Sequence, residues 1–197
     1  MANPLFDSLF GQHLNNDAVF LHLPDGGSIT YAAFLQTAAQ YAGLLAKLGL
    51  KPGDRLAVQI AKSPQALAVY AACAQAGIVI LPLNTAYTPD EVSYFVENSG
   101  ARVLLCDQAN AGGLAPVAQA CGATLETLNA DGSGSFPDQA KAMPTSFETV
   151  ARDGDDLAAF LYTSGTTGRS KGAMLTQNNL LSNAEVLMAQ WQFTAND

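Results

Sequence analysis

The sequence has 197 residues, of which 49% are hydrophobic and 13% charged, and its 9 basic against 17 acidic side chains give a formal net charge of −8. Nucleic acid and anionic membranes both bind basic surfaces, so neither is expected as the main partner. The three cysteines, Cys73, Cys106 and Cys121, lack metal-binding spacing and are expected to be free thiols in a reducing compartment.

The N-terminal part predicts neither a targeting segment nor a membrane span. No lysine or arginine precedes Lys47, and targeting segments need basic residues there, so a cytoplasmic protein is expected. The apolar run 66–83 approaches the length of a membrane span. However, Ser63 and Pro64 are typical of a helix start and Gly77 of a helix end, which predicts a helix followed by a buried strand.

Helical and strand patterns alternate along the first 128 residues. A capping box with a first-turn proline opens one of the helices at Thr88, and this helix is expected to stop near Gly100. The other predicted elements are a helix at 30–48, strands at 55–60, 102–107 and 123–128, and a helix at 109–120. This order predicts an α/β fold, with a parallel or mostly parallel sheet, helices on both faces and ligands at the carboxyl ends of the strands.

Residues 129–156 differ in composition, with three glycines, two prolines and five aspartates. They are expected to form a surface connection with at most a short turn of helix. The GSGS sequence at 132–135 is similar to the start of a dinucleotide-binding fingerprint. Pro137 stands where the third glycine would be needed and no helix is expected to start there, so a flexible loop is predicted.

The segment LYTSGTTGRSKGAMLT at 161–176 has no apolar side chain between Thr163 and Gly172. The apolar run before it predicts a buried strand, so Thr163 should emerge at the carboxyl end of that strand. Its three glycines are expected to let backbone N–H groups bend toward a ligand, and its hydroxyls, Arg169 and Lys171 add further donors. Because no Asp or Glu occurs from residue 157 to 184, the ligand is predicted to be an anion such as a polyphosphate.

Two other interpretations of this segment are possible. It could be a solvated hairpin between Leu161 and Ala173 that binds nothing. A Walker P-loop needs Ser or Thr after the lysine, whereas Gly172 follows Lys171 here, so an ordinary P-loop NTPase is disfavoured.

YTSGTTGRSKGAMLT resembles the phosphate-binding signature of the adenylate-forming enzymes, which include acyl-CoA synthetases, peptide-synthetase adenylation domains and firefly-type luciferases. The similarity extends over nearly the whole chain, including residues 51–107. Many members have proline where this chain has Ser170. Together with PLNTAYT at 82–88, the motif is most similar to malonyl-CoA synthetases.

The resemblance implies the N-terminal part of the large domain of an acyl-CoA synthetase, with ATP, Mg²⁺ and coenzyme A as cofactors or co-substrates. Such an enzyme converts a carboxylate into an acyl-adenylate and then into an acyl-CoA. The residues that it implies for the ATP phosphates are Thr163, Ser164, Gly165, Thr166, Thr167, Gly168, Arg169, Ser170 and Lys171, with Thr166 or Thr167 near the metal. No catalytic residue is assigned within 1–197, and His13, His22, Asn84 and Tyr87 are expected to be structural or surface residues.

By the same resemblance, residues 1–197 are expected to be an incomplete AMP-binding domain without turnover of its own. The part expected after Asp197 would contain the adenine, acyl and coenzyme A pockets and the C-terminal domain. That part would be the partner of residues 1–197. A small carboxylate, malonate or methylmalonate, is the expected substrate. Two alternatives stay open: another acyl-CoA synthetase of the superfamily, and a non-catalytic phosphate-binding or interaction module that retains only the loop.

A final helix is predicted after Thr176, with an apolar stripe of Leu180, Leu181, Ala184, Leu187, Met188 and Trp191. Part of that stripe is expected to pack against segments beyond Asp197.

Overall fold

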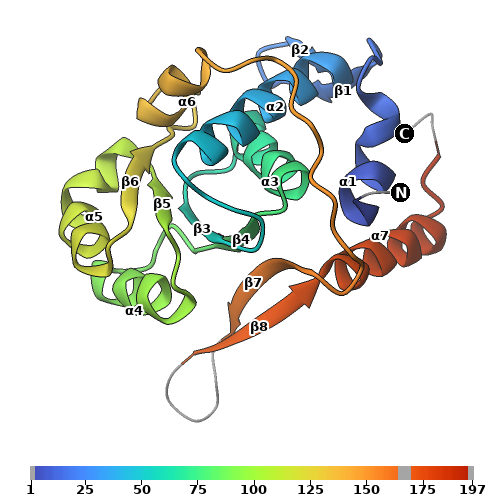
Figure 1. The fold of residues 1–197 in the computed structure, drawn as a ribbon. Coiled ribbons are helices and arrows are strands. Elements are labelled where there is room, and N and C mark those ends of the chain that lie inside the picture. The colour runs from blue at the N-terminus through green and yellow to red at the C-terminus, as the bar shows by residue number, and fades with distance from the viewer. Residues whose placement is uncertain (1–2, 164–169, 195–197) are drawn as a thin grey trace.

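A mostly parallel sheet forms the centre of the computed structural model, which describes residues 3–163 and 170–194 (Figure 1). Its six strands lie in the order β6-β5-β3-β4-β7-β8, and every neighbouring pair is parallel except β7 and β8. They are β3 (Arg55–Gln59), β4 (Val79–Pro82), β5 (Val103–Cys106), β6 (Thr124–Thr127), β7 (Leu157–Thr163) and β8 (Lys171–Thr176). The predicted α/β fold is confirmed.

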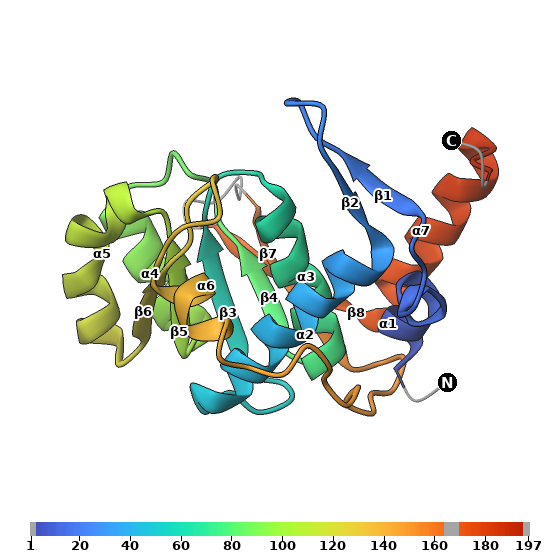
Figure 2. The same cartoon turned by 90° about the horizontal axis from the view of Figure 1, so that it is seen from above.

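Helices cover both faces of this sheet (Figures 1 and 2). The helices are α1 (Pro4–Leu9), η1 (Gly11–His13), α2 (Tyr31–Lys47), α3 (Pro64–Ala76), α4 (Pro89–Ser99), α5 (Gln108–Cys121), α6 (Ser135–Ala140) and α7 (Gln177–Trp191). Side chains of β3 alternate between the two layers, because Leu56 and Val58 join the core beneath α2 and α3 whereas Ala57 joins the core beneath α4 and α5. A separate antiparallel pair, β1 (Val19–His22) and β2 (Ser28–Thr30), precedes α2.

The helix boundaries follow the capping residues of the sequence. The Ser63 side chain accepts the Ala66 N–H at 3.0 Å at the start of α3, and Gly77 ends the helix in the left-handed region with φ of 68°. Thr88 opens α4 with the predicted capping box, and Gly100 ends it with φ of 63°. None of the helices in the described ranges combines the length and apolarity needed to cross a bilayer.

The segment after β6 contains a short helix at a place where none was expected to start. Helix α6 begins at Ser135, directly after Gly134, so the prediction that no helix starts there is wrong. Phe136 is fully buried beside the ring of Tyr41, 5.0 Å away, and this burial fixes the helix on α2. Pro137 is tolerated because it lies in the first turn, where its missing N–H costs nothing. It still replaces the third glycine, so the dinucleotide fingerprint remains incomplete.

Helix α7 is tied to the N-terminus of the chain. Thr176 caps it as predicted, and the buried Gln177 accepts the Leu5 N–H through Oε1 at 3.1 Å. Figure 1 shows α7 running along the edge of the molecule beside α1. Much of its apolar stripe is exposed, including Met188 and Trp191.

Candidate functional site

Strand β7 carries the predicted phosphate-binding segment to the carboxyl edge of the sheet. It runs parallel to β4, with Ala159 beside Ile80, so Thr163 lies at the same edge as the end of β4. Thr163 therefore lies at the carboxyl end of its strand, as expected, and its phosphate-binding role stays a prediction. The predicted binding residues Ser164, Gly165, Thr166, Thr167, Gly168 and Arg169, which include both metal candidates, lie outside the described residues.

The structure describes the two ends of the segment as the stems of an antiparallel hairpin. Thr163 is opposite Lys171 and Tyr162 is opposite Gly172. The described stems therefore pair as in the hairpin considered as an alternative, and Thr163 and Lys171 lie at the edge of the sheet where parallel strands place ligands. The Lys171 side chain is exposed at the start of β8, where a cation can meet an anion in solvent.

Gly172 has a packing role instead of the predicted conformational one. Its φ lies outside the left-handed region, so its backbone is open to other residues. A Cβ at this position would lie 2.6 Å from Cε1 of Phe160 and 3.4 Å from Cε1 of Tyr162. A glycine fits here because a side chain on β8 would collide with the Phe160 ring of the neighbouring strand β7.

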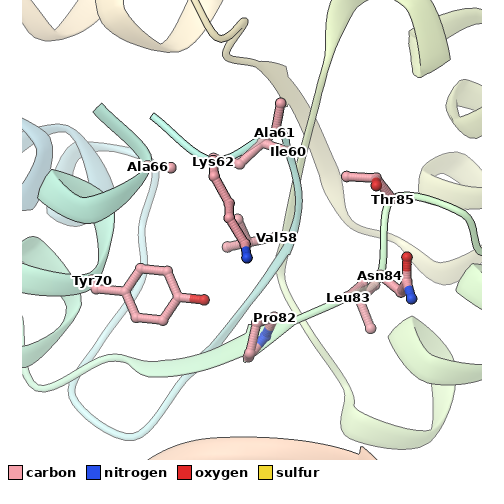
Figure 3. Close-up of a pocket in the computed structure, with 10 residues that line it drawn as sticks. All are labelled: Val58, Ile60, Ala61, Lys62, Ala66, Tyr70, Pro82, Leu83, Asn84 and Thr85. Atoms are coloured by element: carbon pink, nitrogen blue, oxygen red, sulfur yellow. The ribbon is translucent and has the colours of Figure 1, made fainter. Parts of the chain in front are cut away.

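A cavity of about 730 Å³ lies at the same edge, beyond the ends of β3 and β4 (Figure 3). The close-up shows the Lys62 amino group pointing into it from the loop before α3 and the Tyr70 hydroxyl from the second turn of α3, with Asn84 and Thr85 on the opposite wall. The lining residues are Val58, Ile60, Ala61, Lys62, Ala66, Tyr70, Pro82, Leu83, Asn84 and Thr85. An elongated ligand with an apolar body and an anionic group matches these walls.

The pKa of Tyr70 is raised, first by burial and then by the neighbouring Cys73. Its phenol is therefore a neutral hydrogen-bond donor at physiological pH. Lys62 supplies the positive charge on the same side of the cavity.

The PLNTAYT turn, which forms one wall of the cavity, is held from below by a buried glutamine. The Nε2 atom of Gln59 donates to the carbonyl oxygens of Asn84 and Tyr87, both at 3.0 Å. The Asn84 side chain accepts the Ala86 N–H at 2.9 Å. These contacts give Asn84 and Tyr87 a structural role in the turn, and the expectation that neither contacts a substrate stays a prediction.

The sequence and the fold agree with one family. The model of the AMP-binding enzyme family matches residues 10–197. The chain belongs to the AMP-binding enzyme family. The predicted membership in the adenylate-forming superfamily is thereby confirmed.

Several relatives that are similar to this chain are longer than it is. Feruloyl-CoA synthase from Amycolatopsis sp is 33% identical over 87% of this chain and 33% of the relative, and oxalate–CoA ligase from Arabidopsis thaliana is 33% identical over 78% and 31%. Among solved structures, ATP-bound MatB from Rhodopseudomonas palustris is 45% identical, with a TM-score of 0.93 over 98% of this chain and 39% of that one. The chain thus spans about a third of the length of these curated relatives.

For this AMP-binding enzyme chain, sequence reasoning missed the cavity beside Lys62. The available signal was Lys62 itself, a cation placed between a strand end and the Ser63 cap at the predicted ligand edge.

The His13 ring stacks on the ring of Tyr31, with ring centroids 4.2 Å apart. Within residues 3–163 and 170–194, no group of three His, Cys, Asp or Glu side chains is arranged to hold a metal ion.

Proposed function

We propose that this chain is the N-terminal part of a cytoplasmic, ATP-dependent acid–CoA ligase. A carboxylate oxygen attacks the α-phosphorus of ATP and pyrophosphate leaves, which gives an acyl-adenylate. The sulfur of coenzyme A then attacks the acyl carbon, the thiol proton is lost, and AMP leaves with the electron pair of the broken C–O bond. The observation that carries this proposal is the acid-free polar segment at the carboxyl edge of an AMP-binding fold.

In this proposal, residues 163–171 hold the β- and γ-phosphates. The chemistry of the described ends fits such a ligand: Lys171 is an exposed cation, and no Asp or Glu occurs from residue 157 to 184 to repel the phosphates. Donors held at this edge would stabilise charge that builds on the leaving pyrophosphate. The cavity beside Lys62 has a volume of about 730 Å³, which is enough for a small-molecule substrate.

Mg²⁺ would neutralise phosphate charge when bound with ATP. Thr166 or Thr167 is proposed to lie near it. The described residues do not form a metal site by themselves. No step of the reaction is therefore assigned through the metal.

Malonate or methylmalonate is the proposed carboxylate. The support is the similarity of TSGTTGRSKGAML and PLNTAYT to malonyl-CoA synthetases. The identity of the curated relatives does not favour one substrate, because those named for ferulate and oxalate are equally similar to this chain at 33%. A substrate panel on the gene product that contains this chain tests this choice. Formation of a CoA thioester from acetate or benzoate in preference to malonate and methylmalonate would contradict it.

A chimera tests the ligase proposal. Residues 1–197 replace the matching segment of R. palustris MatB, and pyrophosphate and CoA thioester are measured with the substrate of the parent enzyme. We expect turnover, and we expect Lys171→Ala to lower kcat/KM for ATP by roughly ten- to a hundredfold, the worth of a charge-assisted hydrogen bond.

Lys51→Ala is the matched control, because Lys51 is exposed before β3 at the opposite edge of the sheet. Its kcat/KM should stay within about twofold of the unmodified chimera. A folded chimera that binds MgATP without turnover would favour the non-catalytic phosphate-binding module instead. Equal effects of the two lysine substitutions would remove Lys171 from the site.

A further inference from the structure

Helix α4 contacts the polar hairpin on both sides of residues 164–169. The Tyr94 hydroxyl donates to the carbonyl oxygen of Ser170 at 3.1 Å, and the Tyr162 hydroxyl donates to Oδ1 of Asn98 at 2.6 Å. Tyr94 and Asn98 are four residues apart in the helix and therefore lie on the same face. One helical face thus holds a residue of β7 and the residue that precedes β8.

Aromatic packing fixes the same contact. The ring centroid of Tyr162 lies 4.5 Å from that of Phe95 and 6.1 Å from that of Tyr94, the second pair edge to face. Burial, and secondarily the neighbouring Tyr94, raises the pKa of Tyr162. Its hydroxyl is therefore protonated and available as a donor to Asn98 at any physiological pH.

Helix α4 is itself firmly anchored. The Thr88 N–H and hydroxyl both donate to Glu91 Oε2, at 2.8 and 2.9 Å, and these bonds lower the pKa of the Glu91 carboxyl. Val92 and Val96 are fully buried against the sheet. A capped helix with a buried face is a rigid base for contacts made by its other residues.

We propose that Tyr94 and Asn98 are positioning residues that set the geometry of the phosphate-binding segment from its two stems. The inference rests on the proposed function of residues 163–171. Neither side chain is assigned a contact with the ligand. By restricting both stems in the free protein, the two hydrogen bonds reduce the conformational freedom that nucleotide binding would otherwise remove.

Tyr94→Phe is the decisive variant, because it keeps the ring and its packing and removes only the hydroxyl. Titration calorimetry with MgATP on the MatB chimera that carries residues 1–197 should show a dissociation constant roughly three- to tenfold higher, the worth of one neutral hydrogen bond. The urea unfolding midpoint should change little. Tyr87→Phe is the control: its ring also packs on Phe95, 5.0 Å away, whereas its described hydrogen bond joins its carbonyl oxygen to Gln59 and not to the hairpin.

A second pair of variants addresses the other stem. Asn98→Ala and Tyr162→Phe remove opposite partners of one hydrogen bond. Each substitution should weaken MgATP binding. The affinity of the double variant should be no lower than that of the weaker-binding single variant, because the same hydrogen bond can be lost only once. Additive losses would mean that the residues act separately.

Limited trypsin digestion gives a readout without nucleotide. Cleavage after Lys171, followed by mass spectrometry, should be faster in Tyr94→Phe than in wild type or Tyr87→Phe, because one stem has lost its tie. MgATP affinity of Tyr94→Phe equal to that of wild type would overturn the positioning role alone. Failure of the folded, unmodified chimera to bind MgATP would overturn the phosphate-binding assignment and this role together.

Discussion

Among single residues, Gly172 shows that one position of a binding motif can be set by packing. Replacing it with alanine would bring a methyl group within 2.6 Å of Phe160. We expect Gly172→Ala to lower the free energy of unfolding by about 1–3 kcal/mol, as measured by urea denaturation. Gly112→Ala is the control, because a Cβ at this exposed position in α5 meets nothing within 4 Å. That variant should be neutral or more stable by up to about 1 kcal/mol.

Cys106 makes the stability of the fold depend on alkaline pH. Burial, and then the charge of Asp107, raises the pKa of its thiol from 9.0 to about 11. Below pH 9 both folded and unfolded chains keep the proton. Between about pH 9 and 11 only the unfolded chain releases it, so the free energy of unfolding falls by about 1.4 kcal/mol per pH unit from this group.

Cys106→Ala should therefore reduce that slope by about 1.4 kcal/mol per pH unit, measured by urea unfolding at pH 9 to 11. Burial also raises the pKa of Cys73, and it raises the pKa of Tyr41 to about 12, so part of the slope should persist. Val103→Ala removes buried volume without a titratable group and should lower stability equally at every pH. Parallel curves for wild type and Cys106→Ala would refute the assignment.

At the scale of elements, α4 depends on its capping box. Thr88→Ala removes the hydroxyl that accepts the Glu91 N–H, and we expect a loss of about 1 kcal/mol in thermal or urea unfolding. Thr37→Ala is the matched control: the Thr37 hydroxyl donates within α2 to the Ala33 carbonyl, so alanine should be neutral or stabilising there. A loss of the same size in both variants would show that the capping geometry contributes nothing specific.

The elements that could be predicted from the sequence are those with local signals. Caps such as Thr88 and Gly100 mark their own helix ends, and periodic apolar runs identified strands β3 to β6. Strand β8 was missed because KGAMLT shows no alternation, and its first four residues are all exposed in the structure. Helix α6 was missed because the burial of Phe136 depends on Tyr41, which is distant in sequence.

Part of the candidate site could also be predicted from local sequence signals, and part could not. The composition of residues 163–171 indicated an anion, and the end of an apolar run indicated the edge of the sheet. The contacts of Tyr94 and the space beside Lys62 depend on which strands become neighbours, and β7 pairs with β4 across a long stretch of chain. Such pairing leaves no trace in local periodicity.

At the scale of the whole molecule, the exposed apolar residues gather on β8 and α7. Met174, Val186 and Trp191 are 61%, 58% and 64% exposed. In the described part of the chain, β8 is also the terminal strand of the main sheet. Apolar side chains beside a sheet edge favour association.

We expect the 197-residue chain to self-associate with rising concentration, as measured by sedimentation velocity. Trp191 is the only tryptophan in the sequence, so a shift of its fluorescence to shorter wavelength should accompany association. Val186→Lys should keep the chain monomeric to higher concentration. Leu14→Lys, at an exposed position outside β8 and α7, should not; a monomeric wild type, or equal effects of both charges, would contradict the prediction.

The position of α4 has a mechanical consequence for the site as a whole. The helix starts where the wall of the cavity at Asn84 and Thr85 ends, and Tyr94 holds the hairpin about 8 Å along its axis. Because α4 is capped and has a buried face, it is a fixed spacer with the cavity wall near one end and the hairpin stem at Tyr94. The distance between these two parts of the candidate site is therefore set by the length of helix between Pro89 and Tyr94.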